Sequence, residues 1–598
     1  MIKLNKLFIF IIMLISMNSQ AFAGSTDSWK DQILYFVLLD RFYDGNKENC
    51  HNTDKNNLMA FHGGDIAGLE QKLGYLEELG ITGIWVSPFL KNRPNAFYGQ
   101  EAYHGYWPYD FFNVDERFGT KEDLISLRKA MKNKNMKLLL DMVVNHVGYD
   151  APFVNEHKDW FNPMINIKNW DDPEEVKNRC IFGLPDFASQ KPEVKQFFCD
   201  VSKYWIELLQ PDGFRLDAVK HVNDDFWHEF NDNARKLSKS DFILLGEYLH
   251  GDPVLVNKIW HSAGFDCLFD FPLYYTMKDV FAQNGDCRKL ASRLYYDRYY
   301  PDAGMLATLL DNHDLDRFIS SCRGDMNKYK LAMAFLMSVR GIPTLCYGDE
   351  QALRGTHKSL PHNRCDMKFT IRSKMFNFTK EMIAMRKSNE ALRRGLHCHI
   401  YADNDLYIFG RLLPNQLCVA MFNNSDEVRN FEVDFPFVFQ NNNSKFTADY
   451  GDKDCYFVKN KDKIKGKISA KNFAIFTFNN NSNFYEKAYE SWNNQLKFED
   501  YWGRKKITFI LNTDKIEKNT DYYLIGNCKE LGDWNVADAV LMKAVSKNKL
   551  EAEVELPIGK IFDCKCLKTS NNKTTWMGGE NIIDVVNNRN NQSVKIKW

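Results

Sequence analysis

Two side chains of opposite charge stand two residues apart in the stretch GFRLDAVKH, residues 213–221. Its first five residues have the pattern of a β-strand, in which alternate side chains point to the same face. Arg215 and Asp217 therefore share a face, and Lys220 and His221 follow directly. The pair could be a structural ion pair, or a catalytic carboxylate that the neighbouring cation keeps ionised. The stretch alone leaves both interpretations open.

Three further segments end an apolar run with acidic residues or histidines. They are DMVVNH (141–146), LLGEYLHG (244–251) and LLDNHDLDR (309–317). Each pattern is weak evidence by itself, because it occurs by chance. Together they place Glu247 and Asp314, with His146 and His313, at the ends of separate runs. Two carboxyl groups that meet at one site can act as proton donor and nucleophile.

The elements that would position these residues alternate between apolar runs and amphipathic stretches. The eight runs span residues 32–42, 83–89, 137–146, 213–217, 242–247, 265–271, 304–314 and 342–350. This alternation predicts parallel strands with helical crossovers, and eight units predict an α/β fold, the (β/α)8 TIM barrel. Seven of the runs end in polar or charged residues, at the end of the strands where barrel active sites lie.

The rest of the chain divides by composition. The first residues combine Lys3 and Lys6, an apolar run at 7–17 and a small-residue cleavage site at 21–23, which is typical of a secretory signal peptide; an uncleaved anchor is the alternative. The predicted segments are a signal peptide at 1–23, a catalytic barrel at 24–390 with an inserted subdomain at about 147–200, a β-sandwich domain C at 391–482, a linker at 483–500 and an all-β module at 501–598. We expect a secreted, extracellular protein.

The charge of the chain limits the partners that we expect, and its cysteine content bears on disulfide bonds. The 598 residues carry 78 basic and 78 acidic side chains, so nothing electrostatic favours nucleic acid or an anionic membrane as partner. We expect neither of them, and we expect a monomer. The 14 cysteines are even in number, which predicts disulfide bonds in an exported chain. Buried free thiols are the alternative, because several cysteines lie in apolar runs.

Taken in order, the four segments resemble the signature regions of the α-amylase family, glycoside hydrolase family 13. AYHGYWPYDFFNVDERFGT (102–120) resembles that family's second-strand loop, and the resemblance covers roughly residues 30–480. It implies a retaining α-amylase that cuts internal α-1,4-glucosidic bonds of starch, glycogen and maltooligosaccharides. Asp217 resembles the nucleophile, Glu247 the acid/base and Asp314 the third carboxylate. Retaining enzymes hold the first two about 5–5.5 Å apart.

The same resemblance implies further roles. The predicted sugar contacts are Tyr106, His146, Arg215, Lys220, His221, His313 and Arg364. The implied main calcium site comprises Asn145, Asp186 and the carbonyl oxygens of Asp171 and His221. The implied second calcium site comprises Asp44, Asn46, Asn49, Gly63 and Asp65. Oxygen ligands suit Ca²⁺, although Cys50 stands where the family usually has an asparagine in the second set.

The C-terminal segment resembles a family 20 carbohydrate-binding module, a starch-binding domain. ELGDW (530–534), FDCKCLK (562–568) and TTWMGGEN (574–581) carry the resemblance. It implies a starch site made of Trp534, Lys565, Trp576 and Asn581.

Two other functions stay open. A glucanotransferase that forms cyclic or longer glucans is favoured by Phe182, since such enzymes have an aromatic residue four positions before the Asp186 equivalent. Leu249 disfavours it, because those enzymes usually place a phenylalanine there. A catalytically inactive starch binder is disfavoured by the complete set of Asp217, Glu247 and Asp314.

Overall fold

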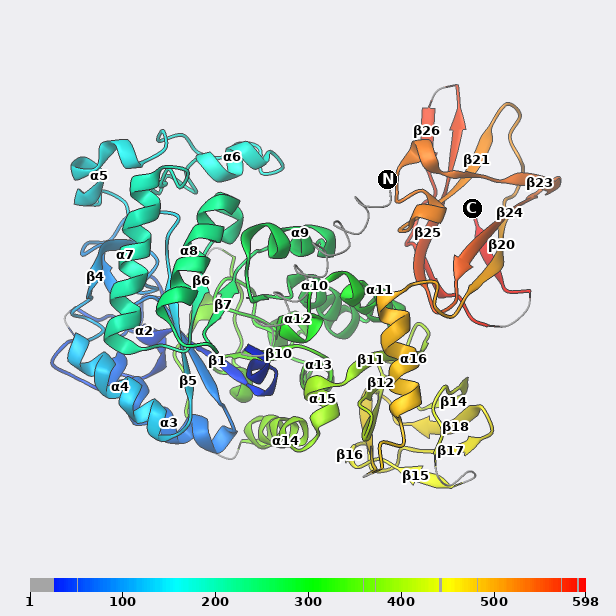
Figure 1. The fold of residues 1–598 in the computed structure, drawn as a ribbon, viewed down its shortest axis with the longest axis horizontal. Helices are drawn as coiled ribbons and strands as arrows, with labels where there is room; N and C mark the ends of the chain where they lie inside the picture. The colour runs from blue at the N-terminus through cyan, green and yellow to red at the C-terminus, as the bar shows by residue number, and fades with distance from the viewer. Residues whose placement is uncertain are drawn as a thin grey trace, which may run out of the picture. The chain divides into compact units, whose positions relative to one another are not determined.

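The computed structural model describes residues 26–50, 52–358, 360–370, 373–439, 444–480, 482–571, 573–588 and 591–598. The predicted signal peptide lies outside these residues. The chain forms two compact units (Figure 1). Among the described residues, the first comprises those up to 283 together with those of 300–395, and the second comprises those of 284–299 and 396–598.

The first unit contains the predicted barrel. Its eight parallel strands are β1 (Leu34–Val37), β2 (Gly83–Val86), β5 (Lys137–Met142), β6 (Gly213–Leu216), β7 (Ile243–Gly246), β8 (Cys267–Leu268), β9 (Ala307–Leu309) and β10 (Ile342–Cys346). They pair in the order β8-β7-β6-β5-β2-β1-β10-β9, and a parallel bridge between Phe269 and Ala307 joins the two ends of the sheet. Each strand falls within one predicted run, so the predicted fold class is confirmed.

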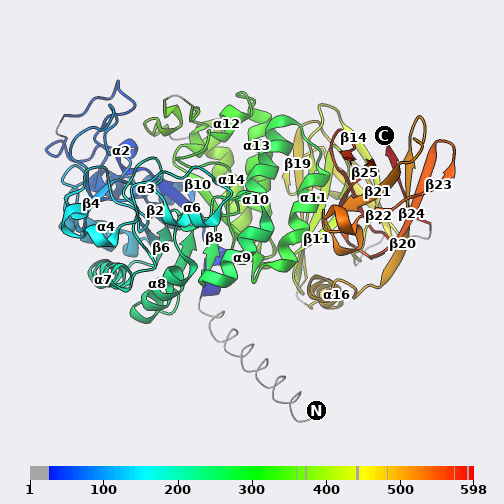
Figure 2. The same cartoon turned by 90° about the horizontal axis from the view of Figure 1, so that it is seen from above.

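Amphipathic helices cover the barrel. They include α3 (Ile66–Leu79), α4 (Lys121–Asn133), α7 (Pro192–Leu209), α8 (Asp224–Leu237), α9 (Pro253–Ala263), α13 (Met326–Ser338) and α14 (Lys374–Ser388). Local signals fix where they begin: Thr120 and Asp123 form a reciprocal capping box on α4. Figure 2 shows α3 beside α4 and α7 beside α8 around the strands.

The segment between β5 and α7 forms the inserted subdomain. It contains two short helices, α5 (Pro152–Glu156) and α6 (Pro173–Asn178). Phe187 of this segment packs against Phe111 of β4 (Pro108–Val114) and Phe198 of α7. These aromatic contacts attach the insert to the barrel beside the carboxyl ends of the strands.

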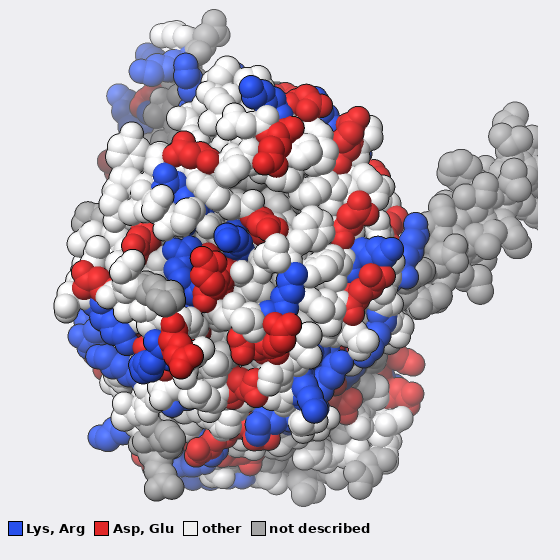
Figure 3. All heavy atoms as spheres, turned by 90° about the vertical axis from the view of Figure 1, so that its left-hand side faces the viewer, with Lys and Arg blue, Asp and Glu red and all other residues white. Residues whose placement is uncertain are grey.

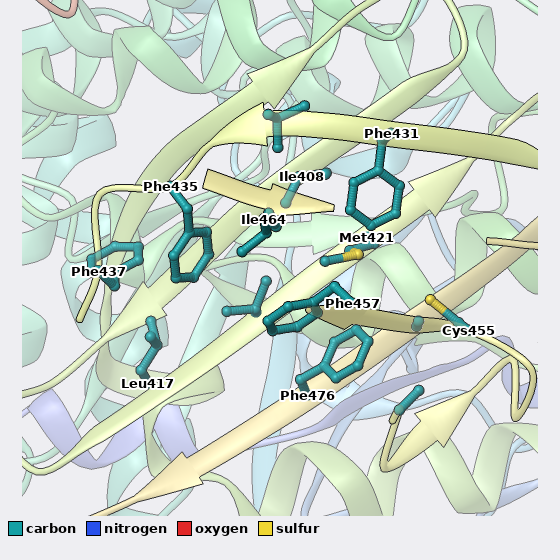
Figure 4. Packing of buried hydrophobic residues seen from close by; sticks show 14 of the residues in the cluster. Ile408, Leu417, Met421, Phe431, Phe435, Phe437, Cys455, Phe457, Ile464 and Phe476 are labelled. Carbon is teal, nitrogen blue, oxygen red and sulfur yellow. The ribbon is translucent and has the colours of Figure 1, made fainter. Parts of the chain in front are cut away.

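The second unit contains the predicted antiparallel sheets of residues 396–479. One sheet has the order β11-β12-β13-β19-β16 and the other β14-β18-β17-β15. Their bounds are β11 (Leu396–Ala402), β12 (Leu406–Leu412), β13 (Gln416–Asn423), β14 (Arg429–Asp434), β15 (Lys445–Thr447), β16 (Tyr450–Gly451), β17 (Tyr456–Asn460), β18 (Lys463–Ile468) and β19 (Asn472–Asn479). Side chains of both sheets, such as Met421, Phe457 and Ile464, fill one core (Figure 4).

The predicted linker at 483–500 is mostly helical. Helix α16 (Glu486–Lys497) places Ala488, Tyr489 and Trp492 against the core of the preceding sheets. Alanine and two aromatic residues at helical spacing bury a stripe, and burial of apolar surface stabilises a helix that polar composition alone would leave marginal.

Two further sheets form the C-terminal module. Their strands are β20 (Arg504–Asn512), β21 (Asp521–Gly526), β22 (Val540–Leu541), β23 (Lys543–Ser546), β24 (Lys549–Pro557), β25 (Ile561–Ser570), β26 (Lys573–Trp576), β27 (Ile582–Val585) and β28 (Ser593–Lys597). One sheet has the order β23-β24-β20-β28, and β22, β21, β25, β26 and β27 form the other. The two sheets enclose one core and therefore form a β-sandwich; the core includes Phe509, Leu524, Leu550 and Phe562.

The structure contradicts the prediction of disulfide bonds. The described residues include all 14 cysteines, and every one is a free thiol. Twelve are buried, among them Cys564 and Cys566 in the core of the C-terminal module. A buried free cysteine behaves as a small apolar side chain, so these residues serve packing.

Basic and acidic side chains are interspersed on the face that Figure 3 shows, so neither sign of charge dominates there. No helix within the described ranges is long and apolar enough to cross a membrane.

Candidate active site

The carboxyl ends of three barrel strands carry the three predicted carboxylates. Asp217 follows β6, Glu247 follows β7 and Asp314 lies five residues after β9. The backbone N–H of Ala218 donates to Glu247 Oε2 over 3.4 Å. Ala218 has a φ of 51°, a conformation that costs energy for a residue with a side chain and recurs at functional sites.

Arg215 joins the carboxylates. Its Nη1 lies 2.6 Å from Asp217 Oδ1 and 2.8 Å from Asp141 Oδ1, and its Nη2 lies 2.6 Å from Glu247 Oε1. The guanidinium is fully buried, with its Cζ 4.8 Å from the centre of the Trp85 ring. A guanidinium is planar and carries several N–H donors, so it can contact three carboxyl groups at once better than the ammonium group of a lysine can.

Burial raises the pKa values of two acids of the site above their ordinary values. Loss of water contact raises the pKa of Glu247 to about 8; the cation of Arg215 opposes this shift, and the charges of Asp217 and Asp314 add to it. Glu247 is therefore protonated at neutral pH and can donate a proton. Burial likewise raises the pKa of Asp141 to about 6, against the effect of Arg215.

Asp314 has a different environment. Its side chain is 42% exposed, compared with 11% for Asp217 and Glu247, so it faces the open side of the site. Burial alone would raise the pKa of Asp314, but neighbouring charges, including the guanidinium of Arg364 at 2.8 Å, lower it to about 2. Arg364, predicted to contact distant sugars, thus also holds a carboxylate of the site itself.

The predicted aromatic and histidine residues line the same place. Tyr106 stacks on His313 with ring centres 4.9 Å apart and planes within 4°, and its hydroxyl donates to Asp141 Oδ2 over 2.8 Å. His146 Nε2 lies 3.0 Å from the carbonyl oxygen of Tyr106. Burial lowers the pKa of His146 and lowers that of His313 to about 3, so both rings are neutral and can exchange hydrogen bonds with a neutral ligand.

Comparison with known proteins decides the family. The alpha amylase catalytic domain model matches residues 36–375, and the starch binding domain model matches residues 504–596. The chain belongs to the α-amylase family, glycoside hydrolase family 13, and carries a family 20 starch-binding domain.

Relatives within this family have several activities. A beta/alpha-amylase of Paenibacillus polymyxa is 31% identical over 66% of this chain, which spans only 34% of that longer relative. A cyclomaltodextrin glucanotransferase of Klebsiella oxytoca is 26% identical over 92% of both chains. A solved Anoxybacillus alpha-amylase is 33% identical with a TM-score of 0.70, over 76% of this chain and 99% of its own.

Lys220 and His221 lie on a 3₁₀ turn, Val219–His221, directly after the Asp217 strand. His221 Nδ1 lies 3.1 Å from the carbonyl oxygen of Val176 in α6, so it joins the barrel to the insert. Burial lowers the pKa of His221 to about 4, which leaves its ring neutral.

Asp186 and Asn145 of the main calcium set fit a cation. Asp186 is 1% exposed, and its Oδ1 is buried without a hydrogen-bond partner. Its Oδ2 accepts from Asn162 Nδ2 over 2.8 Å, and Asn145 is also in hydrogen-bond contact with this carboxylate. A buried carboxylate oxygen without a partner is costly unless a cation neutralises it, and amide, carboxylate and carbonyl oxygens suit Ca²⁺.

The residues of the second calcium set do not fit the ion. Asp44 Oδ2 lies 2.6 Å from Lys47 Nζ, and Cys50 Sγ lies 3.2 Å from Asp44 Oδ1. Asp65 accepts from the backbone N–H groups of Gly45, Asn46 and Gly68 and from Asn49 Nδ2. Gly63 contributes only a carbonyl oxygen, 3.8 Å from Cys50 Sγ. An ammonium and a thiol thus occupy the surroundings of these carboxylates, where calcium needs free oxygens.

The starch-binding domain brings its two predicted tryptophans together. Trp534 is 36% exposed and Trp576 is 44% exposed, and their ring centres are 6.5 Å apart. Lys565 Nζ donates to the carbonyl oxygen of Gly579 over 2.5 Å, which orders the loop that carries exposed Asn581. Two adjacent exposed rings offer stacking surfaces for a carbohydrate.

Sequence reasoning missed two residues of these sites. Asp141 accepts from Arg215, Tyr106 and Trp85 Nε1, although it begins the DMVVNH segment and could have been selected from it. Asn162 reaches Asp186 from 24 positions earlier in an irregular loop, for which no sequence signal exists.

We expect Arg215→Met to lower the free energy of unfolding of the barrel by about 3–5 kcal/mol, because three buried carboxyl groups lose their only shared cation. Arg215→Lys should lose less, since an ammonium restores the charge without the fork. The measurement is the barrel transition in calorimetry with parallel urea unfolding. Arg179→Met, which removes a partly exposed ion pair between residues one helical turn apart, Arg179 and Glu175, is the control and should cost less than about 1 kcal/mol. Equal losses in Arg215→Met and Arg179→Met would contradict the expectation.

Proposed function

We propose that this protein is a secreted α-amylase that hydrolyses internal α-1,4-glucosidic bonds of starch and glycogen with retention of configuration. The observation that carries the proposal is one buried guanidinium between two carboxyl groups, of which Glu247 keeps its proton at neutral pH. A protonated acid beside a carboxylate is what a retaining glycosidase requires. Secretion is supported by residues 1–23 alone.

The chemistry has two steps. Asp217 attacks the anomeric carbon, the bond from that carbon to the glycosidic oxygen breaks, and Glu247 gives its proton to the departing oxygen. Glu247, now a carboxylate, takes a proton from water, and the resulting oxygen displaces Asp217 from the sugar. Arg215 contacts both carboxyl groups, so it stabilises the negative charge that moves from Asp217 in the first step to Glu247.

The remaining residues hold the sugar. Asp314 presents a carboxylate on the open side and accepts hydrogen bonds from hydroxyls of the reacting ring. Tyr106 supplies an apolar face, and neutral His146 and His313 donate or accept single hydrogen bonds. Such groups suit a neutral polyhydroxylated substrate better than a charged one.

We also propose that Asn145, Asp186, Asn162 and the carbonyl oxygens of Asp171 and His221 hold a structural Ca²⁺. The support is the buried Oδ1 of Asp186, which has no other partner. The ion would neutralise that charge and tie the insert to the barrel.

A glucanotransferase is the second candidate. Phe182 supports it, because its side chain is 76% exposed beside Trp170 and could exclude water while an acceptor sugar binds. The similarity to a cyclomaltodextrin glucanotransferase over 92% of the chain also supports it. Leu249, exposed two residues after Glu247, offers no aromatic face and favours hydrolysis.

Chromatography of early and late products from soluble starch tests the proposal. Short linear maltooligosaccharides with a rapid loss of iodine staining are expected. Cyclic products, or chains longer than a defined linear substrate, would instead establish the transferase. Glu247→Gln should abolish hydrolysis while starch binding through Trp534 and Trp576 persists.

The protonated state of Glu247 predicts the alkaline limit of activity. Since only the protonated form can donate, kcat/KM should fall about tenfold per pH unit above about pH 8. The measurement is kcat/KM on a short maltooligosaccharide across the neutral and alkaline range. The Trp534→Ala/Trp576→Ala double variant is the control, and its kcat/KM should fall over the same alkaline range. Activity that stays constant to about pH 10 would assign the proton donor elsewhere.

Chelation should lower the melting temperature, because an ion that binds only the folded state stabilises it; the effect is about 2.7 kcal/mol when the ion is at one hundred times its Kd. Added Ca²⁺ should restore the melting temperature. Asp186→Asn is expected to lose this response, whereas Asp44→Asn, in the set that does not fit, should keep it. A response that disappears only in Asp44→Asn would reverse the assignment.

A further inference from the structure

An irregular segment of the chain carries Asp314 to the open side of the site. The described residues 310–317, between β9 and the short helix α12 (Phe318–Ser321), contain no strand or helix. His313 is 2% exposed, whereas the side chain of its neighbour Asp314 is 42% exposed. Buried backbone carbonyl groups outside regular structure need other hydrogen-bond partners. The position of the Asp314 carboxylate therefore depends on the side chains that hold this segment.

Asn363 supplies two of those hydrogen bonds. Its Nδ2 donates to the carbonyl oxygen of His313 over 2.7 Å and to that of Leu315 over 3.0 Å. These carbonyl groups flank Asp314 in the chain, so one amide group fixes the backbone on both sides of the carboxylate. An amide nitrogen carries two N–H donors, and both are used here. Asn363 is fully buried and is not among the predicted site residues.

Arg317 ties the same segment back to Asn363. Its Nε donates to the backbone carbonyl oxygen of Asn363 over 2.8 Å, and its Nη1 lies 3.3 Å from Asp311 Oδ1. Arg317 is 1% exposed. The segment thus holds the 3₁₀ turn His362–Arg364 through Arg317, and the turn holds the segment through Asn363. Neither part can shift without leaving a buried polar group unpaired, which is unfavourable.

We propose that Asn363 is a positioning residue for Asp314: it holds the backbone that carries the carboxylate, whereas Arg364 holds the carboxylate itself. The proposal rests on the glycosidic cleavage proposed above. A displacement of a reacting group by about 1 Å can cost about a hundredfold in rate. Because Asn363 is fully buried, its effect on the reaction passes through this segment.

A double-mutant cycle between Asn363→Ala and Asp314→Ala in the full-length protein tests the proposal. Release of nitrophenol from a nitrophenyl maltotrioside is measured on folded protein, at enzyme concentrations high enough for the slow variants. Asn363→Ala should lower kcat/KM about tenfold, mainly through kcat, because it weakens a contact made in the transition state. In the Asp314→Ala background the same change should cost less than about twofold, since the group that Asn363 positions is already absent.

Asn231→Ala is the matched control. Asn231 of α8 is also fully buried, and its Nδ2 donates to the carbonyl oxygen of Ala263 at the end of α9 over 2.9 Å. Its replacement removes the same kind of hydrogen bond, so the melting temperature should fall as it does in Asn363→Ala. The kcat/KM of the control should stay unchanged in both backgrounds.

Two results would overturn the proposal while cleavage stands. An equal loss of kcat/KM in both backgrounds would assign Asn363 to general stability, and an unchanged kcat/KM would remove it from the reaction. Asn363→Ser, a smaller change that keeps a hydroxyl donor, is measured in parallel and should show the same pattern with a smaller loss. Hydrolysis and transfer both release nitrophenol, so the cycle is independent of which one follows. Absence of release from wild type refutes the proposed cleavage, and the proposal for Asn363 falls with it.

Discussion

The active site depends on one buried cation. Arg215 is fully buried and contacts Asp141, Asp217 and Glu247, which come from the ends of three adjacent strands. Strand register makes this convergence unavoidable: Asp141 pairs with Arg215 across β5 and β6, and Arg215 pairs with Leu245 across β6 and β7. A charge buried so deeply is tolerated only with partners, so the position of the guanidinium fixes those of the three acids.

The same low-dielectric surroundings act differently on neighbouring acids. Glu247 shares its cation with two other carboxyl groups, and burial dominates, so the pKa rises to about 8. Burial acts to raise the pKa of Asp314 as well, but the charges of His313, Arg364 and Arg215 outweigh it, so the pKa falls to about 2. Neighbouring acids of one site thus differ in protonation because burial and the nearby charges balance differently at each.

The sequence predicted those parts of the fold and site that local pattern encodes. The eight apolar runs located all eight strands, and the spacing of Arg215 and Asp217 placed both on one face. Contacts between distant segments were out of reach: Asn162 on Asp186 and Arg364 on Asp314 depend on how loops return to the barrel. The even number of cysteines led to the wrong prediction because a count carries no geometry; in the structure all 14 are free thiols, and twelve are buried.

A neutral polymer as ligand explains the distribution of charge and aromatic surface. Long-range attraction cannot guide a glucan, and the mixed charges of Figure 3 provide none. Ring faces at short range can provide recognition instead, and Trp534 and Trp576 of the starch-binding domain present two adjacent exposed ones. The starch-binding domain is covalently joined to the barrel, so a chain held by the tryptophan pair remains at high local concentration for the barrel without any new contact there.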